Sequence, residues 1–247
     1  MEAALDIRDL GVSLSDGDRG FALRVPELRI AAGETVGLTG PSGTGKTLLL
    51  ELLGLLRAPE PGGIYRLRPA DGPARDLAAL WTGRGGLAPL RGRLFGFVPQ
   101  TGGLLPFLTL AENVALPQRI CARPDPGLVS DLIARLGLGP VAGLRPERLS
   151  IGQRQRAAIA RALAHRPRFV IADEPTAALD PENAAEAMSL LFETAARSGA
   201  AVIVSSHDLD LLKRFSLTRY RLEIDPDHAP GRPVSRLIAA ADGQEAA

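Results

Sequence analysis

The segment from Gly40 to Thr47 constrains this chain more than any other part of its sequence. It reads Gly-Pro-Ser-Gly-Thr-Gly-Lys-Thr and fits the pattern G-x-x-x-x-G-K-[ST]. Glycines in this pattern leave room for successive backbone N–H groups to surround phosphate oxygens. A short stretch at residues 35–39 with the composition of a buried strand precedes the loop, and a stretch at 46–56 that is nearly apolar from Leu48 onward follows it. This order predicts a buried strand, a phosphate-binding loop and a buried helix, and hence an α/β fold.

The loop predicts a site for ATP and Mg²⁺. The Lys46 ammonium is expected to contact the β- and γ-phosphates, and the Thr47 hydroxyl to ligate Mg²⁺. The positive end of the following helix is expected to face the same phosphates. The chain has 27 arginines and only two lysines, Lys46 and Lys213, which suggests that position 46 requires a lysine. The predicted nucleotide-binding residues of the loop are Gly40, Pro41, Ser42, Gly43, Thr44, Gly45, Lys46 and Thr47.

A second chemical signal is the apolar run at residues 169–172, which ends in Asp173 and Glu174. A strand ending this way places its carboxylates at the carboxyl edge of the sheet, where α/β proteins bind ligands. Alone, the pattern fits a solvated turn equally well. Downstream of a phosphate-binding loop, it predicts that Asp173 holds Mg²⁺ and that Glu174 accepts the proton of the attacking water.

Hydrophobic periodicity and turn residues give the remaining elements. Strands are predicted over 5–14, 21–30, 35–39, 95–98, 169–172, 201–205 and 217–224, and helices over 46–56, 150–164, 181–197 and 208–215. Residues 57–95 carry little pattern. Residues 100–148 are predicted to form short helices broken by Pro106, Pro117, Pro124, Pro126 and Pro140.

The segment 149–156, Leu-Ser-Ile-Gly-Gln-Arg-Gln-Arg, resembles the signature motif of ABC ATPases. Ser150 is also a good N-cap for the helix that follows. Other motifs of that family stand in its order between about residues 5 and 225. Gln100 resembles the Q-loop glutamine, residues 178–180 (Ala-Leu-Asp) the D-loop, and His207 the switch histidine.

The resemblance implies a P-loop NTPase core with an N-terminal antiparallel β subdomain and a helical insertion at about 100–165. It also implies one ABC ATPase domain over residues 1–230, followed by a mobile tail at 231–247. The implied catalytic residues are Glu174, His207, Gln100 and Lys46, and the implied metal ligands are Thr47, Gln100 and Asp173.

The family further implies that two copies pack head to tail with ATP between them. Ser150, Gly152 and Gln153 are then expected to bind the nucleotide held by the partner, and His207 to contact the γ-phosphate in its own subunit. Ile151 departs from the commonest signature, which has glycine there. The residue that contacts adenine, Leu14 or Phe21, stays open, as does the choice between ATP and GTP.

Residues 95–100, 104–106 and 110–117 resemble the subgroup that serves lipoprotein release and macrolide export, although amino-acid importers share part of this pattern. The expected function is ATP hydrolysis that powers integral membrane permease subunits from the cytoplasmic side of the membrane. The alternatives are a regulatory clamp of the cell-division type, a soluble ABC ATPase acting on nucleic acid, and a nucleotide-binding module without hydrolysis.

Composition narrows these alternatives. The formal net charge is +1, so no global field favours nucleic acid as a partner. The single cysteine, Cys121, excludes a disulfide scaffold. We find no apolar run of the roughly 18–20 residues that span a bilayer. The acidic, mixed start of the chain does not resemble a signal peptide. Attachment to a membrane is therefore expected to depend on partner subunits.

Overall fold

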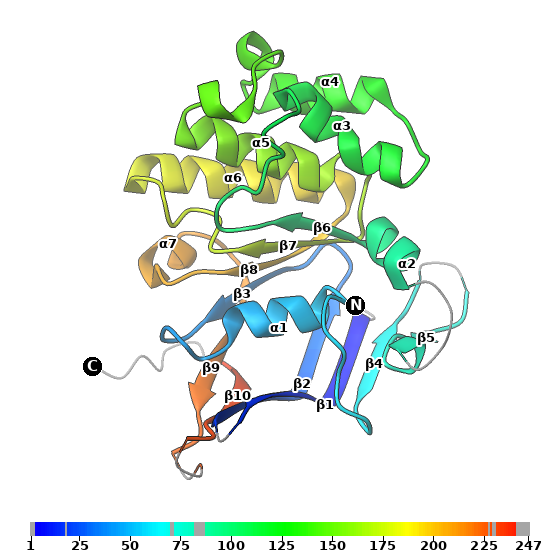
Figure 1. The fold of residues 1–247 in the computed structure, drawn as a ribbon, viewed down its shortest axis with the longest axis vertical. Helices are drawn as coiled ribbons and strands as arrows, with labels where there is room; N and C mark the ends of the chain where they lie inside the picture. The colour runs from blue at the N-terminus through cyan, green and yellow to red at the C-terminus, as the bar shows by residue number, and fades with distance from the viewer. Residues whose placement is uncertain are drawn as a thin grey trace.

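A computed structural model describes residues 3–17, 19–69, 72–81, 87–226, 228 and 231–240 (Figure 1). Within these described residues, one ten-stranded sheet connects a helical layer to an antiparallel layer. The strands are β1 (Ala3–Asp16), β2 (Arg19–Ala31), β3 (Thr35–Thr39), β4 (Ile64–Leu67), β5 (Arg75–Asp76), β6 (Phe95–Val98), β7 (Phe169–Asp173), β8 (Ala201–Ser205), β9 (Thr218–Ile224) and β10 (Val234–Ala239). The α-helices are α1 (Lys46–Leu53), α2 (Leu87–Leu94), α3 (Leu110–Ile120), α4 (Pro126–Arg135), α5 (Ile151–Leu163), α6 (Pro181–Ser198) and α7 (Leu209–Lys213). Short 3₁₀ turns are η1 (Ala79–Trp81), η2 (Gly139–Val141) and η3 (Pro146–Arg148).

The strand order across the sheet is β5-β4-β1-β2-β10-β9-β3-β8-β7-β6. The run from β9 to β6 is parallel throughout, and β1 pairs antiparallel with both β2 and β4. Strand β10 joins the two parts, because it pairs parallel with β2 and antiparallel with β9. The predicted α/β core and N-terminal antiparallel hairpin are therefore both present.

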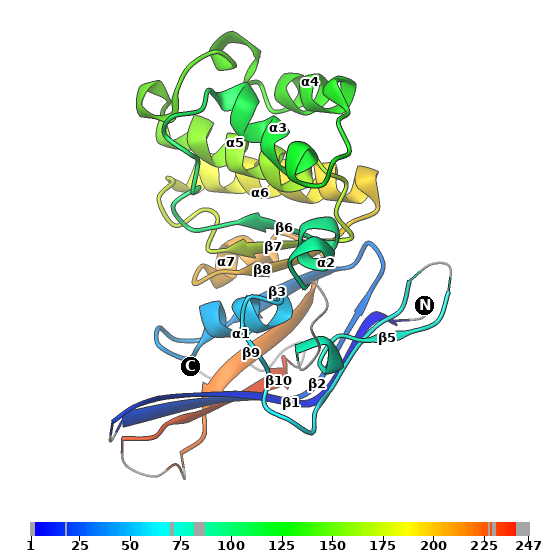
Figure 2. The ribbon, with the colours of Figure 1, turned by 45° about the vertical axis from the view of Figure 1, so that its right-hand side comes forward.

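In the described part of the chain, two apolar cores lie on opposite faces of the parallel strands. Ile171 and Ile203 belong to the core that contains α1 and the β1–β2 hairpin. Val170 and Val202 belong to the core beneath the helical layer. Consecutive residues of a strand point to opposite faces, so a strand buried on both sides is apolar at every position. Figure 2 shows α1 between the parallel strands and the β1–β2 layer.

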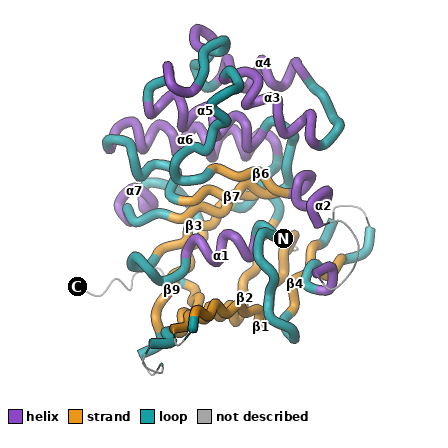
Figure 3. The backbone as a smooth tube through the Cα atoms, viewed as in Figure 1, coloured by secondary structure: helices purple, strands orange, loops and turns teal. Residues whose placement is uncertain are grey.

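The segment that connects β6 to β7 along the chain contains α3, α4 and α5, which belong to the helical layer (Figure 3). Thr109 begins α3 with a capping box to Glu112. The prediction that Pro117 breaks a helix is wrong, because α3 continues through it to Ile120. Pro117 lies in the second half of the helix and removes one backbone N–H donor there. The buried Leu110 packs in the core beneath the helical layer, and the capping box stabilises the first turn of α3.

Two stretches are more ordered than the sequence indicates. The prediction of a mobile tail over 231–247 is wrong for Val234–Ala239, which form β10. Ser235 and Leu237 are buried there, while Arg236 between them is exposed, an alternation too short to stand out in sequence. Residues 241–247 lie outside the described residues. Residues 57–95, where no pattern is evident, contain β4, β5, η1 and α2. None of the described helices is long and apolar enough to cross a bilayer.

Candidate functional site

The phosphate-binding loop connects β3 to α1, as predicted. Gly40 has φ 140°, and a Cβ there would lie 2.6 Å from the carbonyl oxygen of Leu222, so its place excludes any side chain. Gly45 has φ 88° and immediately precedes the first turn of α1. A Cβ on Gly45 would lie 2.9 Å from the ring of Phe21, which therefore packs directly on the loop. The loop is thus shaped from both sides by the sheet.

The Lys46 side chain lies inside this loop and is only 6% exposed. Its Nζ donates to the carbonyl oxygens of Gly40, at 2.9 Å, and Pro41, at 3.2 Å. Burial lowers the pKa of Lys46, and the negative charges of Glu174 and Asp173 oppose that shift. The backbone of the loop therefore holds the Lys46 ammonium in place. The same loop is expected to bind the phosphate oxygens through its N–H groups.

Asp173 ends β7, two strands away from β3, and reaches the start of α1. The Thr47 hydroxyl donates to Asp173 Oδ2 at 2.8 Å. The two side chains thus place hard oxygen ligands side by side at the edge of the loop. This set suits Mg²⁺, which usually takes one or two carboxylates together with substrate phosphates. Among the described residues, no cluster of three or more His, Cys, Asp and Glu forms a separate metal site.

Glu174 is the residue on which the predicted catalytic side chains meet. Gln100 Nε2 donates to its Oε2 at 3.4 Å. His207 Nε2 contacts its Oε1, and Lys46 Nζ lies 3.9 Å from the same oxygen. Glu174 has φ 45°, a left-handed conformation that is uncommon for a residue with a side chain. Motifs separated by more than a hundred residues therefore converge on one carboxylate.

A cleft of about 530 Å³ opens beside this carboxylate. Leu14 and Phe21, a cross-strand pair of the β1–β2 hairpin, both line it, as does Gln100. Both candidates for the adenine contact are thus in the same cleft. The described residues that line it are Leu14, Phe21, Ser42, Gly43, Gly45, Lys46, Thr47, Leu48, Glu51, Arg57, Gln100, Glu174 and His207.

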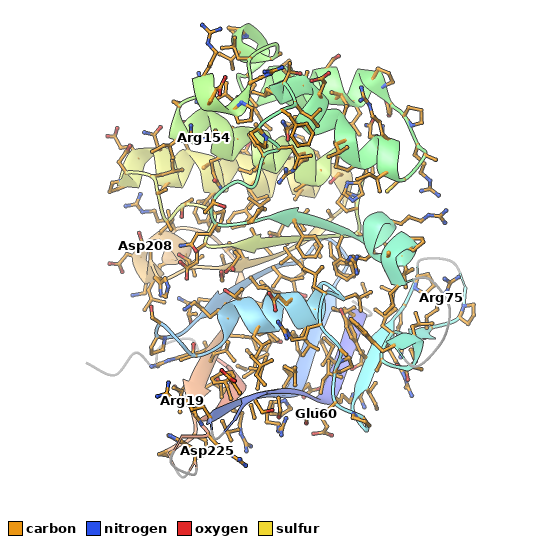
Figure 4. The ribbon with its side chains drawn as sticks, viewed as in Figure 1. Arg19, Glu60, Arg75, Arg154, Asp208 and Asp225 are labelled. Carbon is orange, nitrogen blue, oxygen red and sulfur yellow. The ribbon has the colours of Figure 1, made fainter. Side chains whose placement is uncertain are left out.

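The signature residues lie outside that cleft, at the start of α5. Ser150 is the N-cap, and its side chain forms a reciprocal capping box with Gln153. Ile151, which replaces the usual glycine, is 50% exposed, and the described residues leave the space around a Cβ at Gly152 open within 4 Å. Figure 4 labels Arg154 of α5 and Asp208, the residue after His207, on the same side of the molecule.

Arg161 is a residue near the site that sequence patterns did not indicate. It lies on α5 and donates to the carbonyl oxygens of Gly102, at 2.9 Å, and Gly103, at 2.7 Å. These glycines follow Gln100 closely in the chain. The sequence around an arginine in a helix does not predict this contact, because the contact depends on how the loop after Gln100 lies against α5.

The fold and the site together define a P-loop nucleotide hydrolase. The sequence pattern of the ABC transporter family matches residues 23–177. The chain belongs to this family, and it is an ATP-hydrolysing enzyme of the ABC transport type.

Individual relatives agree with this placement. The chain is 44% identical over 192 residues to the lipoprotein-releasing system ATP-binding protein LolD of Anaeromyxobacter dehalogenans, covering 76% of this chain and 77% of that one. It is 38% identical over 202 residues to the methionine import ATP-binding protein MetN of Xanthomonas axonopodis pv. citri, covering 81% of this chain but 58% of that one.

Solved structures share the fold. The dimeric structure of MJ0796, a bacterial ABC transporter cassette, aligns with a TM-score of 0.74 at 30% identity, covering 88% of this chain and 94% of that one. A dimeric post-hydrolysis state of the same cassette bound to ADP and Pi aligns with a TM-score of 0.70 at 28% identity, covering 93% and 96%.

Proposed function

We propose that this chain is the ATPase subunit of a lipoprotein-release transporter and powers a membrane permease from the cytoplasmic side. Relatives named for lipoprotein release support this choice, since they match most of their own length. The methionine import relative matches over little more than half of its length, which favours release over import. The helical segment at about 100–165 would be the subdomain that transmits conformational change from the nucleotide site to the permease.

The observation that carries the hydrolytic assignment is the convergence on Glu174. Its carboxylate meets His207, Gln100 and Lys46, so it lies where the γ-phosphate end of a nucleotide in the loop would be. In this role Glu174 accepts the proton of the attacking water, and Gln100 and His207 orient the reacting groups. Lys46 supplies positive charge to the β- and γ-phosphates.

Thr47 and Asp173 would hold Mg²⁺, with Gln100 as a further oxygen ligand. The ion, when bound, supplies charge neutralisation to the phosphate oxygens. The Thr47–Asp173 contact fixes the positions of the two side chains before any ligand binds. This division leaves Glu174, one residue further along the chain, to act on water.

The exposed start of α5 completes the proposal. Ser150, Gly152 and Gln153 lie outside their own cleft, and helix N-termini favour anions. We place them on the nucleotide of a second copy, in a head-to-tail pair. Dimeric relatives of the same fold support this arrangement. Leu14 and Phe21 would together form the apolar wall against the base.

The Glu174→Gln variant tests the assignment. It keeps the shape of the side chain but removes the base and its charge, so turnover should fall about 10²–10⁴-fold while ATP still binds. The variant should elute from size-exclusion chromatography as a dimer with ATP and as a monomer with ADP. Glu193→Gln, an exposed position on α6, is the matched control and should behave like the parent. Hydrolysis at the parental rate by Glu174→Gln would overturn the assignment.

The cargo is tested in the host. Depleting the chain should make lipoproteins accumulate in the cytoplasmic membrane fraction, measured by fractionation and immunoblotting. Re-expressing the parent chain should reverse the accumulation, and re-expressing Glu174→Gln should not. An unchanged lipoprotein distribution after depletion would contradict a lipoprotein-release function and leave the ATPase assignment intact.

A further inference from the structure

Ser205 is a polar residue where the fold would accept an apolar one. It ends β8, whose other residues are Ala201, Val202, Ile203 and Val204, and its exposure is 0%. A buried hydroxyl destabilises a fold unless its hydrogen bonds are satisfied, whereas valine or alanine would carry no such requirement. The position therefore calls for an account of what the hydroxyl does.

The Ser205 hydroxyl contacts both acids of the site. It donates to Asp173 Oδ1 at 2.7 Å, and it accepts from the backbone N–H of Glu174 at 2.9 Å. Ser205 and Asp173 are register partners across the parallel β7–β8 pair, so the sheet itself sets this contact. One oxygen thus acts as donor and acceptor at once, which a hydroxyl can do and an apolar side chain cannot.

We propose that Ser205 is a positioning residue of the hydrolytic site, which fixes the Asp173 carboxylate and the backbone turn at Glu174 through one buried hydroxyl. The proposal rests on the roles proposed above for the two acids. Ser205 itself touches neither the cleft nor the phosphate-binding loop among the contacts described, so it acts through its neighbours.

The effect on Asp173 is to fix the orientation of its carboxylate. Ser205 holds Oδ1 from β8, and Thr47 holds Oδ2 from α1. With both oxygens engaged, rotation of the carboxylate is restrained from two different elements. Groups that hold a metal ligand in this way typically account for a 10–100-fold effect on metal affinity or activity.

The effect on Glu174 is to stabilise an uncommon backbone conformation. Its φ of 45° turns the chain sharply at the end of β7 and directs the side chain toward His207 and Lys46. Such a conformation persists only where its surroundings hold it. The hydrogen bond from its N–H to Ser205 lies at the turn itself.

Four substitutions separate positioning from simple packing. Ser205→Ala removes the hydroxyl. Ser205→Thr and Ser205→Val are nearly isosteric with each other, but threonine keeps a hydroxyl and valine has none. Ser235→Ala is the matched control: Ser235 is also 0% exposed, and among the described residues its hydroxyl bonds only to the Glu223 carbonyl, on β9. Far-UV circular dichroism and thermal melting establish that each variant folds. Should Ser205→Ala not fold, the threonine and valine variants decide.

The expected result is a loss of turnover that follows the hydroxyl. In Ser205→Ala and Ser205→Val, kcat for Mg²⁺-ATP should fall about 10–100-fold with little change in KM, while Ser205→Thr and Ser235→Ala stay near the parent. A second readout uses the non-hydrolysable analogue AMP-PNP. Its thermal stabilisation without Mg²⁺ should be unchanged, and the additional stabilisation on adding Mg²⁺ should shrink in the alanine and valine variants.

The outcomes distinguish this proposal from the one on which it rests. Equal kcat for Ser205→Val and Ser205→Thr, or a Ser205→Ala no worse than Ser235→Ala, would overturn the positioning role. A Glu174→Gln variant that hydrolyses ATP at the parental rate would instead overturn the assigned roles of the acids. Loss of turnover in Ser205→Val with unchanged Mg²⁺ stabilisation would assign the effect to Glu174 alone and refute the part concerning Asp173.

Discussion

The guanidinium of Arg161 donates to the carbonyl oxygen of Gly103 at 2.7 Å and so fastens α5 to the segment that follows Gln100. A second bond from the same group reaches Gly102. Both glycines have positive φ, so the backbone turns its carbonyls toward the helix. Helix α5, which begins at the signature motif, is thereby attached to the loop that contains Gln100, a residue that lines the cleft.

Removing this tie should destabilise the fold. Arg161→Ala leaves two carbonyl oxygens without their charged donor, at a cost of about 2–3 kcal/mol in the free energy of unfolding, measured by urea titration. Arg161→Lys should fall between, because an ammonium lacks the planar fork that serves both oxygens. The control Arg135→Ala, from an exposed pair with Asp131, should change stability by about 0.5 kcal/mol or less. Equal effects of Arg161→Ala and Arg135→Ala would contradict the tie.

The two lysines of the chain offer a matched test of the loop. Lys46→Arg should lower ATP turnover roughly 100-fold, because the wide guanidinium does not fit where a compact ammonium lies between the carbonyls of Gly40 and Pro41. Lys213→Arg, at an exposed position on α7, makes the same chemical change and should keep parental activity. Steady-state ATPase assays compare the two, and normal turnover in Lys46→Arg would show the loop assignment to be wrong.

Gly152→Ala isolates the contact with a second copy. Within the described structure a Cβ at this position meets nothing within 4 Å, and alanine favours a helix over glycine by about 0.5–1 kcal/mol. The melting temperature should therefore stay the same or rise, whereas ATPase activity should fall because the methyl group enters the proposed dimer interface. Gly139→Ala, equally open, should leave both unchanged. Full activity in Gly152→Ala would argue against the head-to-tail pair.

His165 should make stability depend on pH. Burial lowers the pKa of His165 below its ordinary value of 6.5, and the hydrogen bond to the Phe95 carbonyl opposes this only in part. As pH falls below about 6.5, the unfolded chain takes up a proton before the folded one, so the folded state loses stability by at most about 1.4 kcal/mol per pH unit. The free energy of unfolding is measured by urea titration at pH 7.5 and 5.5. It should fall less between these pH values in His165→Gln than in the parent. Parallel pH profiles of parent and variant would refute it.

Local patterns were enough to predict the elements that carry chemistry. The glycine-rich loop before Lys46 and the two acids at the end of β7 each follow a short buried strand, and each consists of residue types that are unusual at the end of a strand. Their positions relative to one another follow from a parallel sheet, because its strands end at the same edge. Roles drawn from the family resemblance, such as that of Ser150, stay predictions until the dimer is tested.

Contacts between distant segments could not be predicted. Strand β10 is short and pairs with β2, about two hundred residues earlier, so no local period indicates it. Ser205 looks like an ordinary strand end until β7 is placed beside it. Arg161 has the same limitation, since its partners are backbone carbonyls, which no side-chain pattern reports. Helix α3 passes through Pro117 because tertiary packing outweighs one lost donor.

The place of β10 in the sheet also affects the order in which the protein can be built. The hairpin of β1 and β2 is synthesised first, yet its connection to the parallel strands runs through residues 234–239. During translation, chains generally fold as segments emerge from the ribosome, beginning with the N-terminal part. Here the hairpin has to wait for nearly the whole sequence before the edge of β2 is covered. Until then, that edge of β2 presents unpaired backbone groups, which makes it a site where another chain could pair.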